Sequence, residues 1–61
     1  MISNLKEIRK SLGKTQTEMA LRVGVSLMAY QLWERGVSTP SEENMPKLES
    51  AIKEMMEEKN A

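Results

Sequence analysis

The side chains best placed to contact another molecule lie in residues 27–35. On a helix that turns 100° per residue, five of them cluster within about 140° on one side. These five are Leu27, Met28, Gln31, Leu32 and Arg35. Ala29, Tyr30 and Trp33 fall on the opposite side and form the natural core face of such a helix. The first set must then point outward, with Gln31 as its central polar side chain.

Covalent chemistry has little support in the sequence. There is no cysteine and no histidine, which excludes disulfides and the usual zinc ligand sets. The carboxylates are spaced as helix surface charges, and no glycine-rich phosphate loop is present. A chain of 61 residues also has no room for a sizeable pocket. We therefore expect no enzyme, no metal, no cofactor and no small-molecule ligand.

Charge is distributed unevenly along a chain whose net charge is zero. Residues 1–40 carry six basic and three acidic side chains, a balance of +3, whereas residues 41–61 carry three basic and six acidic ones, a balance of −3. This asymmetry fits a basic working face with an acidic region kept away from phosphate, or equally a helical surface laced with salt bridges. No apolar run is long enough to span a bilayer, and the start is charged too early for a signal peptide, so we expect a cytoplasmic protein without a membrane partner.

Capping residues and glycines along the chain predict helices and no strand. A first helix opens at Ser3 or Asn4, where Asn4 and Glu7 have the spacing of a capping box, and closes at Gly13. Its apolar stripe is Leu5, Ile8 and Leu12. A second helix of about eight residues opens at Thr15, whose hydroxyl is predicted to accept from the Glu18 amide. Its buried face is Met19, Ala20 and Val23, and Gly24 ends it.

Two short helices then meet at a turn that contains glycine. Ser26 is the predicted N-cap of a third helix, which runs to about Arg35 and ends at Gly36. Together the second and third helices, about residues 16–35, have the helix-turn-helix arrangement. An outward face that begins just after a capped N-terminus is the geometry with which this motif reads DNA.

The last helix has an ambiguous start. Ser41 followed by two glutamates favours an early start, but Pro46 favours a start at Asn44 or Met45, with a distorted turn over residues 41–45. We expect one helix of about residues 45–58. Its apolar stripe is Met45, Leu48, Ile52, Met55 and Met56.

Several positions together resemble a known family. They are Gln16-Thr17-Glu18-Met19-Ala20, Val23-Gly24-Val25-Ser26, Tyr30, Leu32-Trp33-Glu34-Arg35-Gly36 and Thr39-Pro40-Ser41. This pattern, over roughly residues 4–52, is similar to the Cro and phage-repressor helix-turn-helix family, often called XRE-like. The resemblance implies an all-α fold, a small four- to five-helix lambda-repressor-like domain, and we expect residues 1–61 to form that single domain.

The resemblance also implies roles for individual residues. Base edges in the major groove are faced by Leu27, Met28, Gln31 and Leu32. Phosphates are contacted by Lys14, Thr15, Gln16, Ser26, Arg35, Ser38 and Thr39, with the amides of residues 36–39 approaching the DNA backbone. Arg9 and Glu34 match a buried or half-buried salt bridge between the first and third helices. From the residues alone, the same pair could be two solvated charges, and Gln16 only a good first-turn residue.

Apolar side chains stand where this family usually has polar base readers. Leu27, Met28 and Leu32 can contact thymine methyl groups but carry less information per base pair than arginine or glutamine. We expect a transcriptional regulator, a repressor, that binds double-stranded DNA as a homodimer on a palindromic operator. The alternative is a protein-interaction module that uses the fold as a scaffold, with the apolar outward face as its docking surface.

Overall fold

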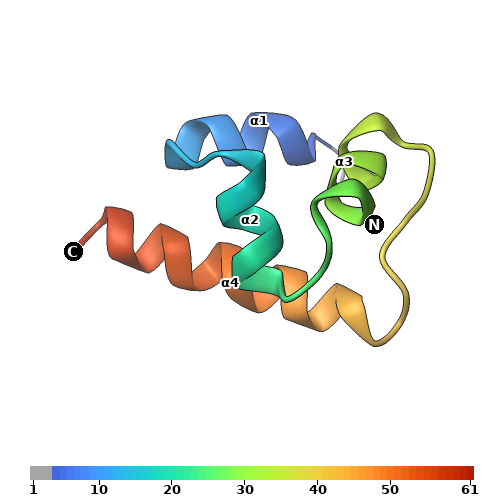
Figure 1. The fold of residues 1–61 in the computed structure, drawn as a ribbon. Coiled ribbons are helices and arrows are strands. Elements are labelled where there is room, and N and C mark those ends of the chain that lie inside the picture. Colours follow the sequence, from blue (N-terminus) through green and yellow to red (C-terminus); the bar gives the residue numbers. More distant parts are fainter. Residues whose placement is uncertain (1–3) are drawn as a thin grey trace.

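Glycines end the first three helices at the predicted places, and side-chain caps open the second and third. The computed structural model describes residues 4–61, and within them it contains four helices and no strand (Figure 1). The helices are α1 (Leu5–Leu12), α2 (Gln16–Val23), α3 (Leu27–Arg35) and α4 (Asn44–Lys59). The all-α prediction is confirmed. None of the helices in residues 4–61 is long and apolar enough to cross a membrane.

The start of α2 follows local hydrogen-bonding rules. The Thr15 hydroxyl accepts from the Glu18 amide at 3.1 Å, and the Glu18 carboxylate accepts from the Thr15 amide at 3.0 Å. This is the predicted capping box, which satisfies two amides that the helix itself leaves without partners. Gly24 ends α2 with a φ of 88°, a left-handed conformation that a side chain would strain.

The start of α3 also depends on a side-chain cap. The Ser26 hydroxyl accepts from the Ala29 amide at 3.1 Å, as predicted for an N-cap serine. Only residues 24–26 separate the two helices, so α3 turns sharply away from α2 (Figure 1). The predicted helix-turn-helix over residues 16–35 is therefore present.

The predicted capping box of α1 is wrong. Asn4 precedes the helix, but its backbone is left-handed, with a φ of 63°, and its side chain accepts no hydrogen bond from the first turn. Asparagine tolerates this conformation better than most residues, because its short polar side chain suits left-handed backbone. Ser3, the other predicted start, lies outside the described residues.

The start of α4 combines both sequence signals. The Ser41 carbonyl accepts from the amides of Asn44 and Met45, at 3.0 and 2.8 Å, and the Ser41 hydroxyl also accepts from Asn44. Ser41 therefore closes a turn that leads into the helix. Pro46 is the third residue of α4, where the absent amide proton removes no helical hydrogen bond.

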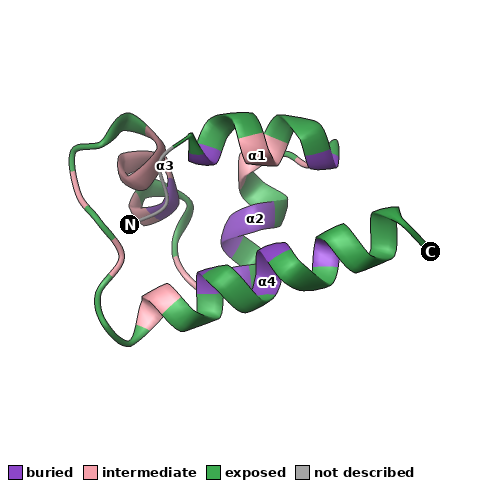
Figure 2. Cartoon of the chain, turned by 180° about the vertical axis from the view of Figure 1, so that it is seen from behind, coloured by how far each residue is buried: buried purple, intermediate pink, exposed green. Residues whose placement is uncertain are grey.

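The core lies where α2 meets the other helices. In both views α1 and α4 run in the same direction on opposite sides of α2, and α3 lies at the end where they begin (Figures 1 and 2). The buried residues of the core are Leu5, Leu12, Met19, Ala20, Val23, Tyr30, Leu48, Ala51, Ile52 and Met55. Each helix contributes at least one of them, so the four helices share a single core.

The core predictions for α3 and α4 hold only in part. Met56 is exposed, because the helical period carries it past the stripe that Leu48, Ile52 and Met55 bury. Trp33 packs against the core as predicted and is half-buried, whereas Tyr30 on the previous turn is fully buried. The two rings meet edge to face with centroids 6.1 Å apart, a favourable aromatic arrangement.

Candidate nucleic-acid interface

The outward face of α3 is apolar at its N-terminal end. Met28 is 70% exposed and Leu27 is 40% exposed, so both are available to another molecule. Gln31 and Leu32, one turn further along, are half-buried, and Arg35 at the C-terminal end is exposed. The predicted outward set therefore does lie away from the core.

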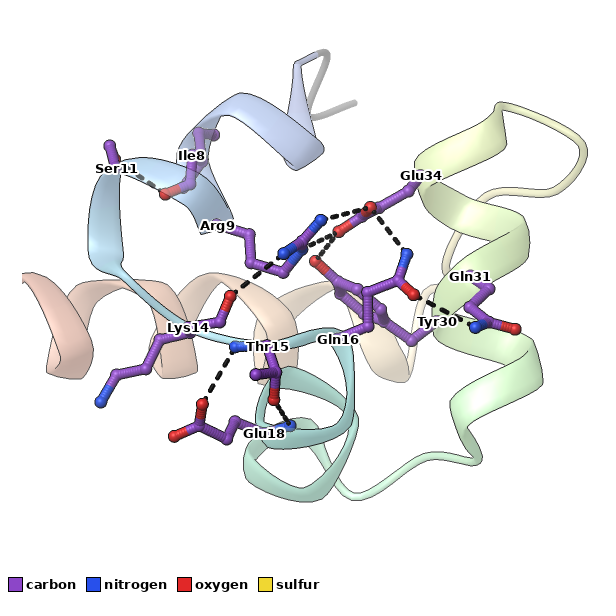
Figure 3. Close-up of polar contacts among 10 residues, drawn as sticks. All are labelled: Ile8, Arg9, Ser11, Lys14, Thr15, Gln16, Glu18, Tyr30, Gln31 and Glu34. Carbon is purple, nitrogen blue, oxygen red and sulfur yellow. Dashed lines mark hydrogen bonds and ion pairs between the residues drawn. The ribbon is translucent and has the colours of Figure 1, made fainter.

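Gln31 and Gln16 are joined across the helix-turn-helix. The Gln31 side-chain amide donates to the Gln16 side-chain carbonyl at 3.1 Å (Figure 3). Gln16 in turn donates to a carboxylate oxygen of Glu34 at 3.0 Å. Two of the polar side chains predicted to contact DNA thus form a chain that ends on Glu34, and this fixes the orientation of both amide groups.

Glu34 collects hydrogen bonds from three helices. Arg9 of α1 donates to it through Nε at 2.7 Å and through a terminal nitrogen at 3.3 Å. The Tyr30 hydroxyl, on the same helix as Glu34, donates to it at 2.5 Å, and Gln16 donates from α2. The Glu34 side chain is only 4% exposed and that of Arg9 13%, so the implied salt bridge is present and well shielded from water. Figure 3 shows these donors converging on the carboxylate.

The surroundings of Glu34 also determine its ionisation. Burial acts to raise the pKa of this carboxyl, but hydrogen bonds from Arg9, Tyr30 and Gln16 outweigh burial and hold the pKa below its usual value. The hydrogen bond to Glu34 raises the pKa of Arg9. Burial, followed by the bond to Glu34, raises the pKa of the Tyr30 hydroxyl. At neutral pH the site therefore holds a carboxylate, a guanidinium and a neutral phenol.

Arg9 also fixes the loop before α2. Its guanidinium donates to the Lys14 carbonyl at 3.1 Å, while the same group holds Glu34. The loop that carries Lys14 and Thr15 is thereby tied to both α1 and α3. One arginine thus positions the N-terminus of α2 relative to α3.

The side chains predicted to contact phosphate come from the loop before α2, the first residue of α2, the two ends of α3 and the loop after it. Exposed members of this set are Thr15, Ser26, Arg35 and Thr39, and half-buried ones are Lys14, Gln16 and Ser38. The hydroxyls of Thr15 and Ser26 each accept a capping hydrogen bond, and their own protons are still free to be donated.

Three of the four amides after α3 that were predicted to approach the DNA backbone form hydrogen bonds within the chain. The amides of Gly36, Val37 and Ser38 donate to carbonyls at the end of α3, at 3.2, 3.1 and 3.4 Å. They satisfy the last carbonyls of the helix. In this loop the remaining candidates for contact with phosphate are the Thr39 amide and the hydroxyls of Ser38 and Thr39.

Basic side chains without ion pairs occur both before residue 41 and on α4. The ion pairs within residues 4–61 are Arg9 with Glu34, Arg22 with Glu58, and Lys47 with Glu43. In this described part of the chain six basic side chains take part in none of them: Lys6, Lys10, Lys14 and Arg35, and on α4 Lys53 and Lys59. Arg22 is the basic side chain of residues 4–40 that pairs with an acidic side chain of α4.

Three further contacts have no counterpart in the sequence predictions. Tyr30 and Glu34 are four residues apart on one helix, and this spacing could have predicted their bond. Arg22 pairs with Glu58 at 2.6 Å, and Lys59 donates to the Ser11 carbonyl at 2.6 Å. These last two contacts fasten the end of α4 to α2 and α1, and no local spacing announces them.

Comparisons with known proteins agree with this geometry. A helix-turn-helix family matches residues 5–59, nearly the whole chain. The chain therefore belongs to the helix-turn-helix family of the Cro and phage-repressor type, a family of DNA-binding transcriptional regulators.

A curated relative is the cryptic phage CTXphi transcriptional repressor RstR of Vibrio cholerae serotype O1. The two are 38% identical over 50 residues, which is 82% of this chain and 45% of the relative. The chain thus spans less than half the length of that repressor. No solved structure matches the chain.

Proposed function

We propose that this chain is the DNA-binding domain of a transcriptional repressor, which inserts α3 into the major groove of double-stranded DNA. The observation that carries the proposal is the exposed N-terminal face of α3, held in place by the chain from Gln31 through Gln16 to Glu34. A recognition helix must be rigid relative to the elements that contact phosphates, because both sets of contacts are made at once. Membership of the helix-turn-helix family supports the same function.

In this proposal the contacts fall into two classes. Leu27, Met28, Gln31 and Leu32 face base edges. Phosphates are contacted by Lys14, Thr15, Gln16, Ser26, Arg35, Ser38 and Thr39. Lysine and arginine neutralise phosphate and make affinity dependent on salt, whereas side chains on base edges provide the choice of sequence. Residues 1–61 act as one domain, and a role on DNA implies a cytoplasmic location.

The proposal includes a homodimer on a palindromic operator. Two copies related by two-fold symmetry would bring their α3 helices to successive major grooves, about 34–36 Å apart. The stoichiometry of binding to a selected duplex, measured by analytical ultracentrifugation, tests this part. Two chains per duplex are expected, and a single chain at saturation overturns the dimer but leaves DNA binding intact.

The test of DNA binding is a selection followed by a titration. A random pool of duplexes is enriched on the purified chain, and the enriched duplex and a scrambled duplex are then titrated over a series of salt concentrations. We expect preference for the enriched duplex and affinity that falls steeply with salt. If no sequence is enriched and no duplex binds even at low salt, the proposal is wrong.

A second candidate function is protein docking, favoured by the exposure of Leu27, Met28 and Met56. Exposed apolar side chains next to one another commonly mark protein interfaces. A stoichiometric protein partner that covers α3, together with no affinity for DNA, decides for this function. DNA titration of the same preparation therefore distinguishes the two candidates.

A further inference from the structure

If the chain binds DNA as proposed above, the side chains at the N-terminal end of α3 limit the base pairs that this helix can recognise. The two most exposed side chains at that end are Met28 and Leu27, and neither can form a strong hydrogen bond. Gln31 is the polar side chain beside them, and one of its amide protons is committed to Gln16. The surface presented to base edges is therefore mainly hydrocarbon.

The thymine C5-methyl is the apolar group that unmodified DNA presents in the major groove. Against the amino group of cytosine or the acceptors of guanine, Met28 and Leu27 would remove water from polar atoms without replacing their hydrogen bonds. Against thymine they bury a methyl group instead. The preference for thymine thus follows both from a favourable contact and from a penalty on the other bases.

The free hydrogen-bonding groups of Gln31 also favour an A·T base pair. Its bond to Gln16 uses one proton of the side-chain amide and leaves one N–H and the carbonyl oxygen free. A bidentate contact to adenine needs one donor for N7 and one acceptor for the N6 amino group, which is what remains. The bond to Gln16 also holds the amide in a fixed orientation, because Gln16 is itself held by Glu34.

We propose that this chain selects A·T base pairs under the N-terminal half of α3, with Leu27 and Met28 in contact with thymine C5-methyl groups and Gln31 bonded to adenine. The specificity of the domain then depends on methyl groups more than on guanine contacts by arginine. Phosphate contacts supply the remaining affinity without regard to sequence.

The test removes single methyl groups from the DNA. The duplex enriched from a random pool is synthesised with deoxyuridine in place of thymidine, one position at a time, so that base pairing is unchanged. We expect about a fourfold loss of affinity for each methyl group that Leu27 or Met28 contacts. Replacing cytosine by 5-methylcytosine in a weak site that carries C·G at such a position is expected to restore part of the lost affinity.

Protein variants assign the effect to side chains. Leu27→Ala and Met28→Ala together should abolish the difference between thymidine and deoxyuridine, and the fold should be unaffected because both side chains are exposed on a helix and alanine favours helix. Leu21→Ala is the matched control, because Leu21 is 76% exposed on α2, and it should keep the full difference.

Each outcome has one meaning. A duplex that is enriched and bound selectively, but with the same affinity after every substitution by deoxyuridine, overturns the methyl contacts and leaves the proposed function standing. A difference that persists in the double alanine variant overturns the assignment to Leu27 and Met28. If no duplex is enriched, the proposed function itself fails, and the inference fails with it.

Discussion

Arg9 and Glu34 join the first and third helices across 25 positions of the sequence, with Nε and Oε2 2.7 Å apart. The same arginine donates to the Lys14 carbonyl, and the same carboxylate accepts from Gln16. The ion pair therefore does more than connect two helices. It positions the N-terminus of α2 and the outward face of α3 as one unit.

Removing Arg9 should strongly destabilise the fold. Arg9→Leu leaves the Glu34 carboxylate largely buried without its charge partner, so we expect a loss of about 3 kcal/mol in the free energy of unfolding. That is a large part of the stability of a domain of this size. Urea unfolding followed by the fluorescence of Trp33 measures the loss.

Arg22 is the matched control for that measurement. Its ion pair with Glu58 is exposed, with side chains 35% and 54% accessible, so Arg22→Leu should cost several times less than Arg9→Leu. Equal losses for the two variants would contradict a special role for the shielded pair.

Stability should fall in acid partly because of Glu34. Its pKa is lowered in the folded chain, so its contribution is fully present above the unfolded value of about 4.3 and is lost as the pH falls through the folded pKa. In Glu34→Gln stability should be lower at neutral pH and should decline less between about pH 5 and pH 3. Unfolding free energies across this range test the prediction.

Other carboxyl groups also make the stability depend on pH in acid. The pKa values of Glu18 and Glu58 are also lowered, by the capping bonds from Thr15 and by Arg22. Some acid dependence should therefore remain in Glu34→Gln. An acid profile parallel to that of the parent chain would show that Glu34 does not contribute to it.

The N-cap of α2 should contribute measurably to stability. Thr15→Ala removes the hydroxyl that accepts from the Glu18 amide, and we expect a cost of about 1 kcal/mol in unfolding free energy. Thr17→Ala is the control on the same helix, where alanine favours helix and no cap is lost. A Thr15→Ala variant as stable as Thr17→Ala would be inconsistent with a working cap.

The local part of the fold could be predicted because its signals are local. Thr15 with Glu18, and Ser26 before α3, satisfy amides three residues away, so their spacing is visible in the sequence. Asn4 with Glu7 has the same spacing but makes no cap, because the backbone at Asn4 is left-handed. Spacing permits a cap, and only the backbone conformation decides whether it forms.

The polar chain of the site could be predicted only in part. The pairing of Arg9 with Glu34 followed from the family resemblance, since nothing in the spacing of two residues so far apart requires it. The bond between Gln16 and Gln31 had no sequence signal at all. An uncharged side-chain amide carries no charge that would indicate its partner in the sequence. The pairing of Gln16 with Gln31 depends on how α2 and α3 cross.

Two substitutions should separate affinity from specificity on DNA. Lys14→Ala removes a phosphate contact, so it should weaken binding to the enriched and scrambled duplexes alike and reduce the salt slope by about 1. Gln31→Ala should weaken the enriched duplex selectively, because it removes the adenine contact. Titrations of both variants on both duplexes distinguish these patterns. A selective loss in Lys14→Ala and a uniform loss in Gln31→Ala would reverse the two assignments.

Binding of DNA by α3 can be observed directly by a nuclear magnetic resonance titration of the isotope-labelled chain with the enriched duplex. We expect the amide signals of residues 14–16 and 26–32 to shift with the added DNA, while those of the exposed face of α4 stay in place. Shifts confined to α4, or no shifts at low salt, would contradict the proposal that α3 is the DNA-reading helix.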